Sequence, residues 1–208
     1  MHNKLLIASH NSGKVKEFQR MLDLEGIELL SLEDLGIKFE AVECGKTFQE
    51  NSEIKAKVYG NLSGLITLAD DSGLSVDSLS GDPGVLSARY GGEGLTDEDR
   101  VQLLLKNMKN IPKSERHARF VAVLTLFIPV NNDQANKLIS IAGTCEGIIA
   151  EKPIGSNGFG YDPVFYVPAL NKTTAQISST EKDSISHRGK ALKKMRIEIQ
   201  KLYNRTND

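Results

Sequence analysis

The longest apolar stretch of the chain, residues 118–130, constrains its fold more than any other feature. Its side chains are mainly β-branched, aromatic or aliphatic, as in a strand that is covered on both faces. A polar turn at residues 131–136 leads to a second apolar stretch at residues 138–142. Two such stretches joined by a short polar turn are typical of an antiparallel hairpin. We therefore predict a long hairpin at the centre of a β-sheet.

Strand and helix patterns alternate before this hairpin. An apolar strand at residues 5–8 leads through a polar turn into a helix that Gly26 is expected to end. Thr47 and Glu50 have the spacing of a capping box and predict the start of a second helix, with Gly64 as its stop.

The remaining elements follow the same alternation. Strands are predicted at residues 66–69 and 74–76, a helix after Thr96, a short strand at residues 164–167 and a last basic helix after Ser186. Because helices interleave with strands while one hairpin is antiparallel, we expect a mixed sheet and the α/β class.

Composition and charge exclude several classes. With 208 residues, 39% hydrophobic and 25% charged, the chain fits one large domain or two intimate lobes, and it is neither disordered nor fibrous. A net charge of -1 gives no overall attraction to nucleic acid or to an anionic membrane. An anionic substrate would therefore have to be held by local basic residues.

The two cysteines, Cys44 and Cys145, are far apart and form no Cys-x-x-Cys pattern. This spacing argues against a zinc site and against a disulfide scaffold, and it favours a reducing compartment. The apolar run at residues 5–8 is too short for a signal sequence or a membrane span. We expect a cytosolic protein.

Asp70 and Asp71 are adjacent carboxylates at the point where an apolar strand is expected to break into a turn. Adjacent carboxylates repel each other unless a cation, a proton or several N–H donors offset their charge, so the pair suggests a divalent metal or acid/base chemistry. The sequence Asp-Asp-Ser-Gly also suits an ordinary turn between strands, and both interpretations stay open on these residues alone.

Other polar clusters could complete such a site. The turn from Ser9 to Lys14 joins a strand to a helix start, a geometry that binds phosphate, although it lacks the Walker spacing. Glu43 could bring a further carboxylate toward the aspartates, or it could be a solvated loop acid. Asn51 and Lys55 share one face of the second helix, where they could serve a phosphate or a metal, or only solubility.

A glycine-rich loop and a basic helix start follow later in the chain. Residues 158–163 place two aromatic rings and a carboxylate in a loop that could stack on a base, or whose rings could fill the core. Lys182, His187 and Arg188 surround the start of the last helix and could hold a phosphate or the acceptor edge of a base.

Taken together, these motifs resemble one known family. The motifs are Ser9-x-Asn11-x-Gly13-Lys14, Thr47-Phe48-x-Glu50-Asn51, Ala69-Asp70-Asp71-Ser72-Gly73-Leu74, Pro83-Gly84-Val85, Ser87-Ala88-Arg89-Tyr90, Gly158-Phe159-Gly160-Tyr161-Asp162-Pro163 and Ser186-His187-Arg188. In this order, and over nearly the whole chain, they resemble the inosine triphosphate pyrophosphatase family.

The resemblance implies an enzyme. Its expected reaction is the hydrolysis of deaminated purine nucleoside triphosphates (dITP/ITP and XTP/dXTP) to the monophosphate and pyrophosphate, which cleanses the nucleotide pool. The expected cofactor is Mg²⁺, and the expected form is a cytoplasmic homodimer with no nucleic-acid or membrane partner. The implied fold is a single domain over residues 1–208, an elongated mixed β-sheet flanked by helices, with two lobes and the active-site cleft between them.

The resemblance also assigns roles to residues. Asp71 is expected to accept a proton, and Glu43 and Asp71 to bind the metal. Asp70 is a second candidate for the proton acceptor. The substrate-binding residues that it implies are Ser9, His10, Asn11, Ser12, Gly13, Lys14, Ser72, Phe159, Gly160, Tyr161, Asp162, Lys182, His187 and Arg188. Lys55 is a further substrate-binding candidate because of its place on the second helix. Phe159 is expected to stack on the base while His187 and Arg188 read its oxo edge.

Two other classes of protein are alternatives to this one. Asp71-Ser72-Gly73 also matches the turn that carries the catalytic aspartate of aspartic proteases, but those enzymes need two such turns and this chain has one. A nucleotide-binding regulator without turnover is the second alternative, and release of pyrophosphate would distinguish it from an enzyme.

Overall fold

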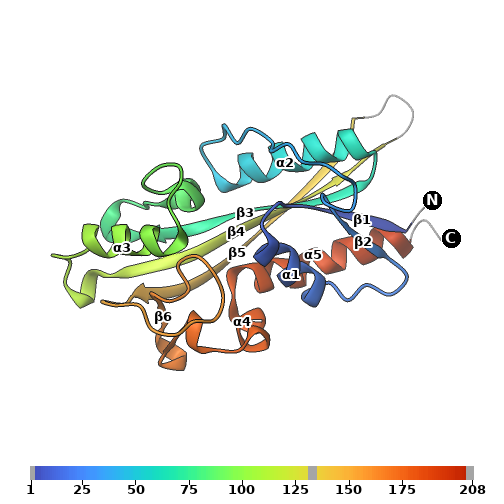
Figure 1. The fold of residues 1–208 in the computed structure, drawn as a ribbon. Coiled ribbons are helices and arrows are strands. Elements are labelled where there is room, and N and C mark those ends of the chain that lie inside the picture. The colour runs from blue at the N-terminus through green and yellow to red at the C-terminus, as the bar shows by residue number, and fades with distance from the viewer. Residues whose placement is uncertain (1–2, 131–134, 205–208) are drawn as a thin grey trace. The chain divides into compact units, whose positions relative to one another are not determined.

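The computed structural model describes residues 3–130 and 135–204, which form a seven-stranded mixed sheet with helices (Figure 1). The strands are β1 (Lys4–Ala8), β2 (Glu28–Ser31), β3 (Ile66–Val76), β4 (His117–Ile128), β5 (Lys137–Ile149), β6 (Phe165–Val167) and β7 (Lys172–Thr173). The helices are α1 (Ser12–Met21), α2 (Phe48–Ser63), α3 (Asp97–Asn107), α4 (Ser179–Ile185) and α5 (His187–Asn204), with short 3₁₀ turns between some of them.

The strand order is β2-β1-β3-β4-β5-β6-β7. Strand β1 pairs in parallel with β2 and with β3, whereas β6 pairs antiparallel with β5 and with β7. The predicted mixed sheet and α/β class are therefore confirmed. Strands β4 and β5 are neighbours, as the hairpin prediction requires, but residues 131–134 of the predicted turn at 131–136 lie outside the described residues.

The chain divides into two compact units. Unit 1 comprises Met1–Asp71, Ala122–Gly143 and Arg188–Asp208, and unit 2 comprises Ser72–Val121 and Thr144–His187. The assignment of one domain to residues 1–208 stays a prediction. No helix within the described parts of the chain is long and apolar enough to cross a membrane.

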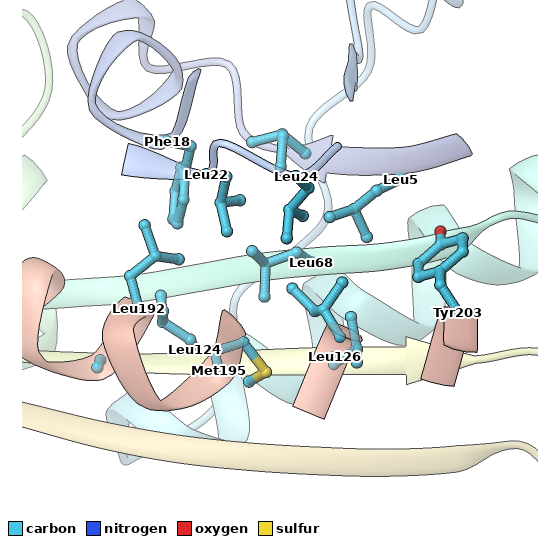
Figure 2. Close-up of a cluster of buried hydrophobic side chains, with 13 residues drawn as sticks. Leu5, Phe18, Leu22, Leu24, Leu68, Leu124, Leu126, Leu192, Met195 and Tyr203 are labelled. Carbon is cyan, nitrogen blue, oxygen red and sulfur yellow. The ribbon is translucent and has the colours of Figure 1, made fainter. Parts of the chain in front are cut away.

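Both faces of the strands in unit 1 are buried. Successive side chains of a strand point to opposite sides, so neighbouring residues of one strand enter different apolar clusters. Leu5 and Ile7 of β1 face α1 and α5, where they join the cluster of Figure 2 together with Leu68 of β3. Leu6 and Ala8, one residue out of phase, pack in a second cluster under α2. Accordingly, Figure 1 shows α1 and α5 on one side of these strands and α2 on the other.

The break that we predicted within residues 70–73 is wrong, because β3 runs without interruption from Ile66 to Val76. The strand accommodates two adjacent acids because Asp70 and Asp71 point to opposite faces of the sheet. Asp70 follows Leu68 on the α1/α5 face, and Asp71 follows Ala69 on the α2 face. Each carboxylate meets cations of its own layer.

Local sequence signals predicted the ends of α2 and the start of α3. Thr47 forms a capping box with Glu50, and Gly64 ends α2 in the left-handed conformation with φ 65°. Thr96 caps α3 in the same way. The predicted end of α1 at Gly26 is wrong, because that helix ends at Met21. Strands β2 and β7 and helix α4 were not predicted, since they are short and only partly apolar.

Unit 2 has its own apolar core. Leu74 and Val76 of β3 pack with Leu104 and Met108 of the α3 region and with Phe165 of β6. The thiol of Cys145 is buried in the same cluster. A single strand, β3, thus contributes Asp71 to unit 1 and the next residues to the core of unit 2.

Gly60 allows α2 to pack closely on β4. A Cβ at this position would lie 2.2 Å from the ring of Phe127. In Gly60→Ala, the better helix propensity of Ala contributes about 1 kcal/mol, but forcing the ring aside costs about 1–3 kcal/mol. We expect the variant to be less stable in urea unfolding, whereas Leu62→Ala on the exposed side of α2 should unfold within about 0.5 kcal/mol of wild type. A stabilised Gly60→Ala would contradict this packing.

Candidate active site

On the α1/α5 face of unit 1, the carboxylate of Asp70 is fully buried among charges. Lys14 Nζ lies 2.8 Å from Asp70 Oδ2, and Arg188 Nη2 donates to the same oxygen at 3.2 Å. The other terminal nitrogen of Arg188 donates to Glu17 of α1. Four buried or partly buried charges, two of each sign, therefore offset one another.

The two cations keep Asp70 ionised. Burial alone would raise the pKa of the Asp70 carboxyl, but Arg188 and Lys14 more than compensate and hold that pKa well below its ordinary value. Burial lowers the pKa of Lys14, and the charge of Asp70 opposes this effect only in part. Asp70 is thus a fixed anion that orients two cations.

Asp71 has a different environment on the α2 face. Lys55 Nζ donates to Asp71 Oδ1 at 2.9 Å and lies 3.0 Å from Glu43 Oε1, so one ammonium group draws two carboxylates together. Burial raises the pKa of Asp71, although Lys55 opposes the shift. The second oxygen of Asp71, Oδ2, is buried and has no hydrogen-bond partner among the described residues.

This donor set fits a hard divalent cation. Mg²⁺ is commonly held by one or two carboxylates together with waters and substrate phosphates. The buried Oδ2 of Asp71 and the partly exposed carboxylate of Glu43 are oxygen donors of this kind. Within residues 3–130 and 135–204, no group of three His, Cys, Asp or Glu side chains is arranged to hold a metal.

The turn between β1 and α1 is accessible and well ordered by its own side chains. Asn11 caps α1, since its Oδ1 accepts from the N–H of Lys14 at 3.0 Å, and the N–H of Asn11 donates to Ser9 Oγ at 3.2 Å. His10 Nε2 lies 2.9 Å from the carbonyl oxygen of Phe39. A cavity of about 330 Å³ borders the turn. The helix start presents N–H groups of the kind that bind phosphate.

In unit 2, the carboxylate of Asp162 organises the predicted base-binding loop. Its Oδ2 accepts from the N–H of Phe159 at 2.9 Å and from Lys182 Nζ at 2.5 Å, and its Oδ1 accepts from Thr174 Oγ1 at 2.8 Å. A Cβ at Gly158, which has φ +79°, would lie 2.0 Å from Asp162 Oδ2. Glycine is therefore required there for the carboxylate to reach the loop.

The aromatic groups of this region are also fixed. Lys182 Nζ lies 4.8 Å from the centroid of the Phe159 ring, and the buried His187 ring stacks on Phe120 with centroids 4.8 Å apart. The hydroxyl of Tyr161 donates to the carbonyl of Ser87 at 2.9 Å. The N–H of Gly160 donates to Asp97 at the start of α3.

The predicted residues thus fall into two sets. Unit 1 contains Ser9 to Lys14, Glu43, Lys55, Asp71 and Arg188, and unit 2 contains Ser72, Phe159 to Asp162, Lys182 and His187. Two peptide bonds, Asp71–Ser72 and His187–Arg188, join the sets covalently.

Three polar residues of these networks were not predicted. Glu17 pairs with Arg188, Thr174 holds Asp162, and Tyr59 holds the segment before Glu43. Glu17 and Tyr59 look like ordinary residues of amphipathic helices, and Thr174 follows another threonine in a polar stretch. Their burial is the signal, and it appears only in the folded chain.

Solved HAM1 proteins share this α/β fold. The HAM1 protein from Coxiella burnetii superposes with a TM-score of 0.83 at 41% identity, covering 95% of this chain and 98% of that one. A structure from Mycobacterium abscessus described as a nucleoside-triphosphatase / dITP/XTP pyrophosphatase has a TM-score of 0.73 at 41% identity, with 92% and 98% covered.

The chain belongs to the Ham1 family, whose model matches residues 5–198. A dITP/XTP pyrophosphatase from Bacillus licheniformis is 48% identical over 192 residues, which cover 92% of this chain and 95% of the relative. A protein of the same name from Bacillus subtilis is 45% identical, with 91% and 93% covered. The family resemblance predicted from the motifs is confirmed, and the aspartic-protease alternative is no longer needed.

Proposed function

We propose that this protein is a nucleoside triphosphate pyrophosphatase that hydrolyses dITP/ITP and XTP/dXTP to the monophosphate and pyrophosphate. The observation that carries the proposal is the spare, buried oxygen of Asp71 beside Glu43 and Lys55. The names of the relatives, dITP/XTP pyrophosphatases over nine-tenths of the chain, supply the substrate class.

The residues of unit 1 act on the triphosphate. The N–H groups at the start of α1 and the side chains of the turn from Ser9 to Lys14 bind phosphate oxygens, and the positive end of the helix dipole favours their charge. Lys14 and Lys55 add two ammonium groups, each oriented by one aspartate. The phosphates are thereby held in line for attack by water.

Glu43 and Asp71 would hold Mg²⁺. The bound ion supplies charge neutralisation at the phosphate oxygens. Asp71 is also the proposed acceptor of the proton of the attacking water. Asp70 is poorly suited to this task, because Arg188 and Lys14 hold the pKa of its carboxyl well below the ordinary value and so make it a weak base, whereas burial raises the pKa of Asp71.

The residues of unit 2 select the base. Phe159 stacks on the purine, and a donor-lined pocket accepts the six-oxo group of hypoxanthine or xanthine. Leaving a buried donor against the amino group of adenine costs about 1–3 kcal/mol per contact, so more than one contact is required. Exclusion of guanine additionally needs an unfavourable environment for its two-amino group.

His187 and Arg188 are proposed to read the oxo edge. Two N–H groups of Arg188 are used by Glu17 and Asp70. Arg188 would therefore read the base with the other N–H groups of its guanidinium. If Arg188→Ala lowers turnover of ITP and of ATP by the same factor, Arg188 does not discriminate between bases and serves only the phosphate side.

The protein is further proposed to work as a cytoplasmic homodimer. Neither Cys44 nor Cys145 forms a disulfide, as is usual in a reducing compartment. Sedimentation of the purified chain tests the assembly, and a monomer at micromolar concentration would contradict it.

Incubation with nucleotides tests the reaction itself. The purified protein is mixed with dITP, XTP, GTP or ATP, with Mg²⁺ or with EDTA, and pyrophosphate and monophosphate are measured. We expect release from dITP and XTP with Mg²⁺, little release from GTP and ATP, and none with EDTA. Nucleotide binding without release would favour a regulator instead, and no metal-dependent release from dITP or XTP would contradict the proposed function.

A further inference from the structure

Glu43 lies in a segment that has no regular secondary structure from Ile37 to Gly45. The backbone N–H and C=O groups of such a segment have no helix or sheet partners, so other groups must hold them if the segment is to keep one conformation. A carboxylate on a loosely held segment would lose conformational freedom each time it bound a cation.

Helix α2 supplies the missing partners from one stripe of its surface. Asn51, Lys55 and Tyr59 are spaced by four residues, which places them on one side of a helix. All three are buried, with exposed fractions of 0%, 8% and 2%. Each contacts a different part of the segment that carries Glu43.

Tyr59 holds the chain ahead of Glu43. Its hydroxyl accepts from the N–H of Ala41 at 3.0 Å and donates to the carbonyl of Phe39 at 3.2 Å. The Tyr59 ring also packs against the rings of Phe39 and His10, with centroids 5.6 and 6.1 Å away. His10 contacts the same carbonyl of Phe39, so this anchor also reaches the turn before α1.

Asn51 holds the chain behind Glu43. Its Oδ1 accepts from the N–H of Gly45 at 2.8 Å. The contact is so close that a Cβ on Gly45 would lie 2.7 Å from that oxygen and 2.6 Å from Cβ of Glu50. Glu50 accepts from the N–H groups of Lys46 and Thr47, which fixes the rest of the connection to α2.

We propose that Asn51 and Tyr59 are positioning residues that clamp the segment on both sides of Glu43 and so place its carboxylate beside Asp71. Lys55, between them on the stripe, then bonds both carboxylates. The inference rests on the proposed role of Glu43 and Asp71 as metal ligands. Neither positioning residue touches the metal or the nucleotide in this proposal, because both act through the backbone.

Tyr59→Phe is the cleanest test, since it removes one hydroxyl and keeps the ring. Tyr203→Phe is the matched control, because Tyr203 is also a buried tyrosine of unit 1 and its hydroxyl donates to the carbonyl of Lys4, away from this segment. Asn51→Leu removes the acceptor for Gly45, and Asn51→Asp keeps an oxygen in its place.

Two measurements are made on each protein. Amide hydrogen exchange of residues 39–47 without nucleotide or metal reports whether the segment is held. The Mg²⁺ concentration for half-maximal dITP hydrolysis, and kcat at saturating Mg²⁺, report whether Glu43 is placed.

In Tyr59→Phe and Asn51→Leu, we expect exchange of the segment to rise at least about tenfold and the required Mg²⁺ to rise about tenfold, the lower end of the effect of removing outer partners of a metal site. The value of kcat at saturating Mg²⁺ should change less than about twofold, because excess cation restores the bound state. Asn51→Asp should keep the Gly45 amide protected, and Tyr203→Phe should change none of these quantities.

The proposal is overturned if exchange of the segment is unchanged, if exchange rises while the Mg²⁺ requirement does not, or if Tyr203→Phe shifts that requirement equally. Failure of the proposed function would show separately, as a wild-type protein without Mg²⁺-dependent turnover.

Discussion

Asp71→Asn is expected to reduce Mg²⁺-dependent hydrolysis of dITP by about 10²–10⁴-fold, the range found when a general base is removed. The amide keeps the size of the side chain and one oxygen, but it can neither accept the proton of water nor contribute a negative ligand charge. Because excess Mg²⁺ can restore binding of the cation but cannot replace the missing proton acceptor, the loss should appear in kcat at every Mg²⁺ concentration. Steady-state release of pyrophosphate measures it.

The control for this variant is Asp77→Asn, which removes a carboxylate that is half exposed and pairs with Arg119. It should keep wild-type turnover, since exposed ion pairs contribute little. Circular dichroism and urea unfolding establish that both proteins are folded. A folded Asp71→Asn protein with near-wild-type turnover would remove Asp71 from the mechanism.

Arg188→Met is expected to give the largest loss of stability, about 3 kcal/mol in the free energy of unfolding. The guanidinium group is 2% exposed and bonds to Glu17 and Asp70, so its removal leaves two buried carboxylates with less compensation. The value lies at the lower end of the range for broken buried pairs because Lys14 still faces Asp70. Urea denaturation measures the change.

Two comparisons separate the network from the helix that carries Arg188. Lys193→Met lies on the exposed side of α5 and should unfold within about 0.5 kcal/mol of wild type. Glu17→Gln should relieve part of the loss when combined with Arg188→Met, because one uncompensated charge disappears, and the double-mutant cycle gives the coupling. Strictly additive losses would mean that the Glu17–Arg188 contact contributes nothing.

Local signals in the sequence predicted those parts of the fold that local physics decides. The capping box at Thr47, the helix start after Thr96 and the helix stop at Gly64 depend on a few neighbouring residues, and all three predictions were correct. The break expected within residues 70–73 was wrong because polarity along the chain does not reveal which layer a side chain faces. Short elements such as β2 form only because β1 lies beside them.

For the site, the motifs identified the residues but not their pairing. Lys14 pairs with Asp70, and Lys55 pairs with Asp71. This pairing depends on the register of β1 and β3, which aligns Ile7 with Leu68 and Ala8 with Ala69. Alternation along β3 then places each aspartate on a definite face of the sheet. That register depends on contacts distant in sequence. Glu17, Thr174 and Tyr59 escaped prediction for the same reason, since only burial distinguishes them from surface residues.

The opposite orientation of Asp70 and Asp71 also restricts how this chain can change over time. Substitution can alter one acid and leave the other in its layer, but no substitution can exchange the two environments. Insertion or deletion of one residue earlier in β3 would exchange them, and it would also turn every apolar side chain between that point and the acids to the wrong face. The spacing between the strand core and the two acids is therefore inherited as one unit, whereas the lengths of surface loops can drift.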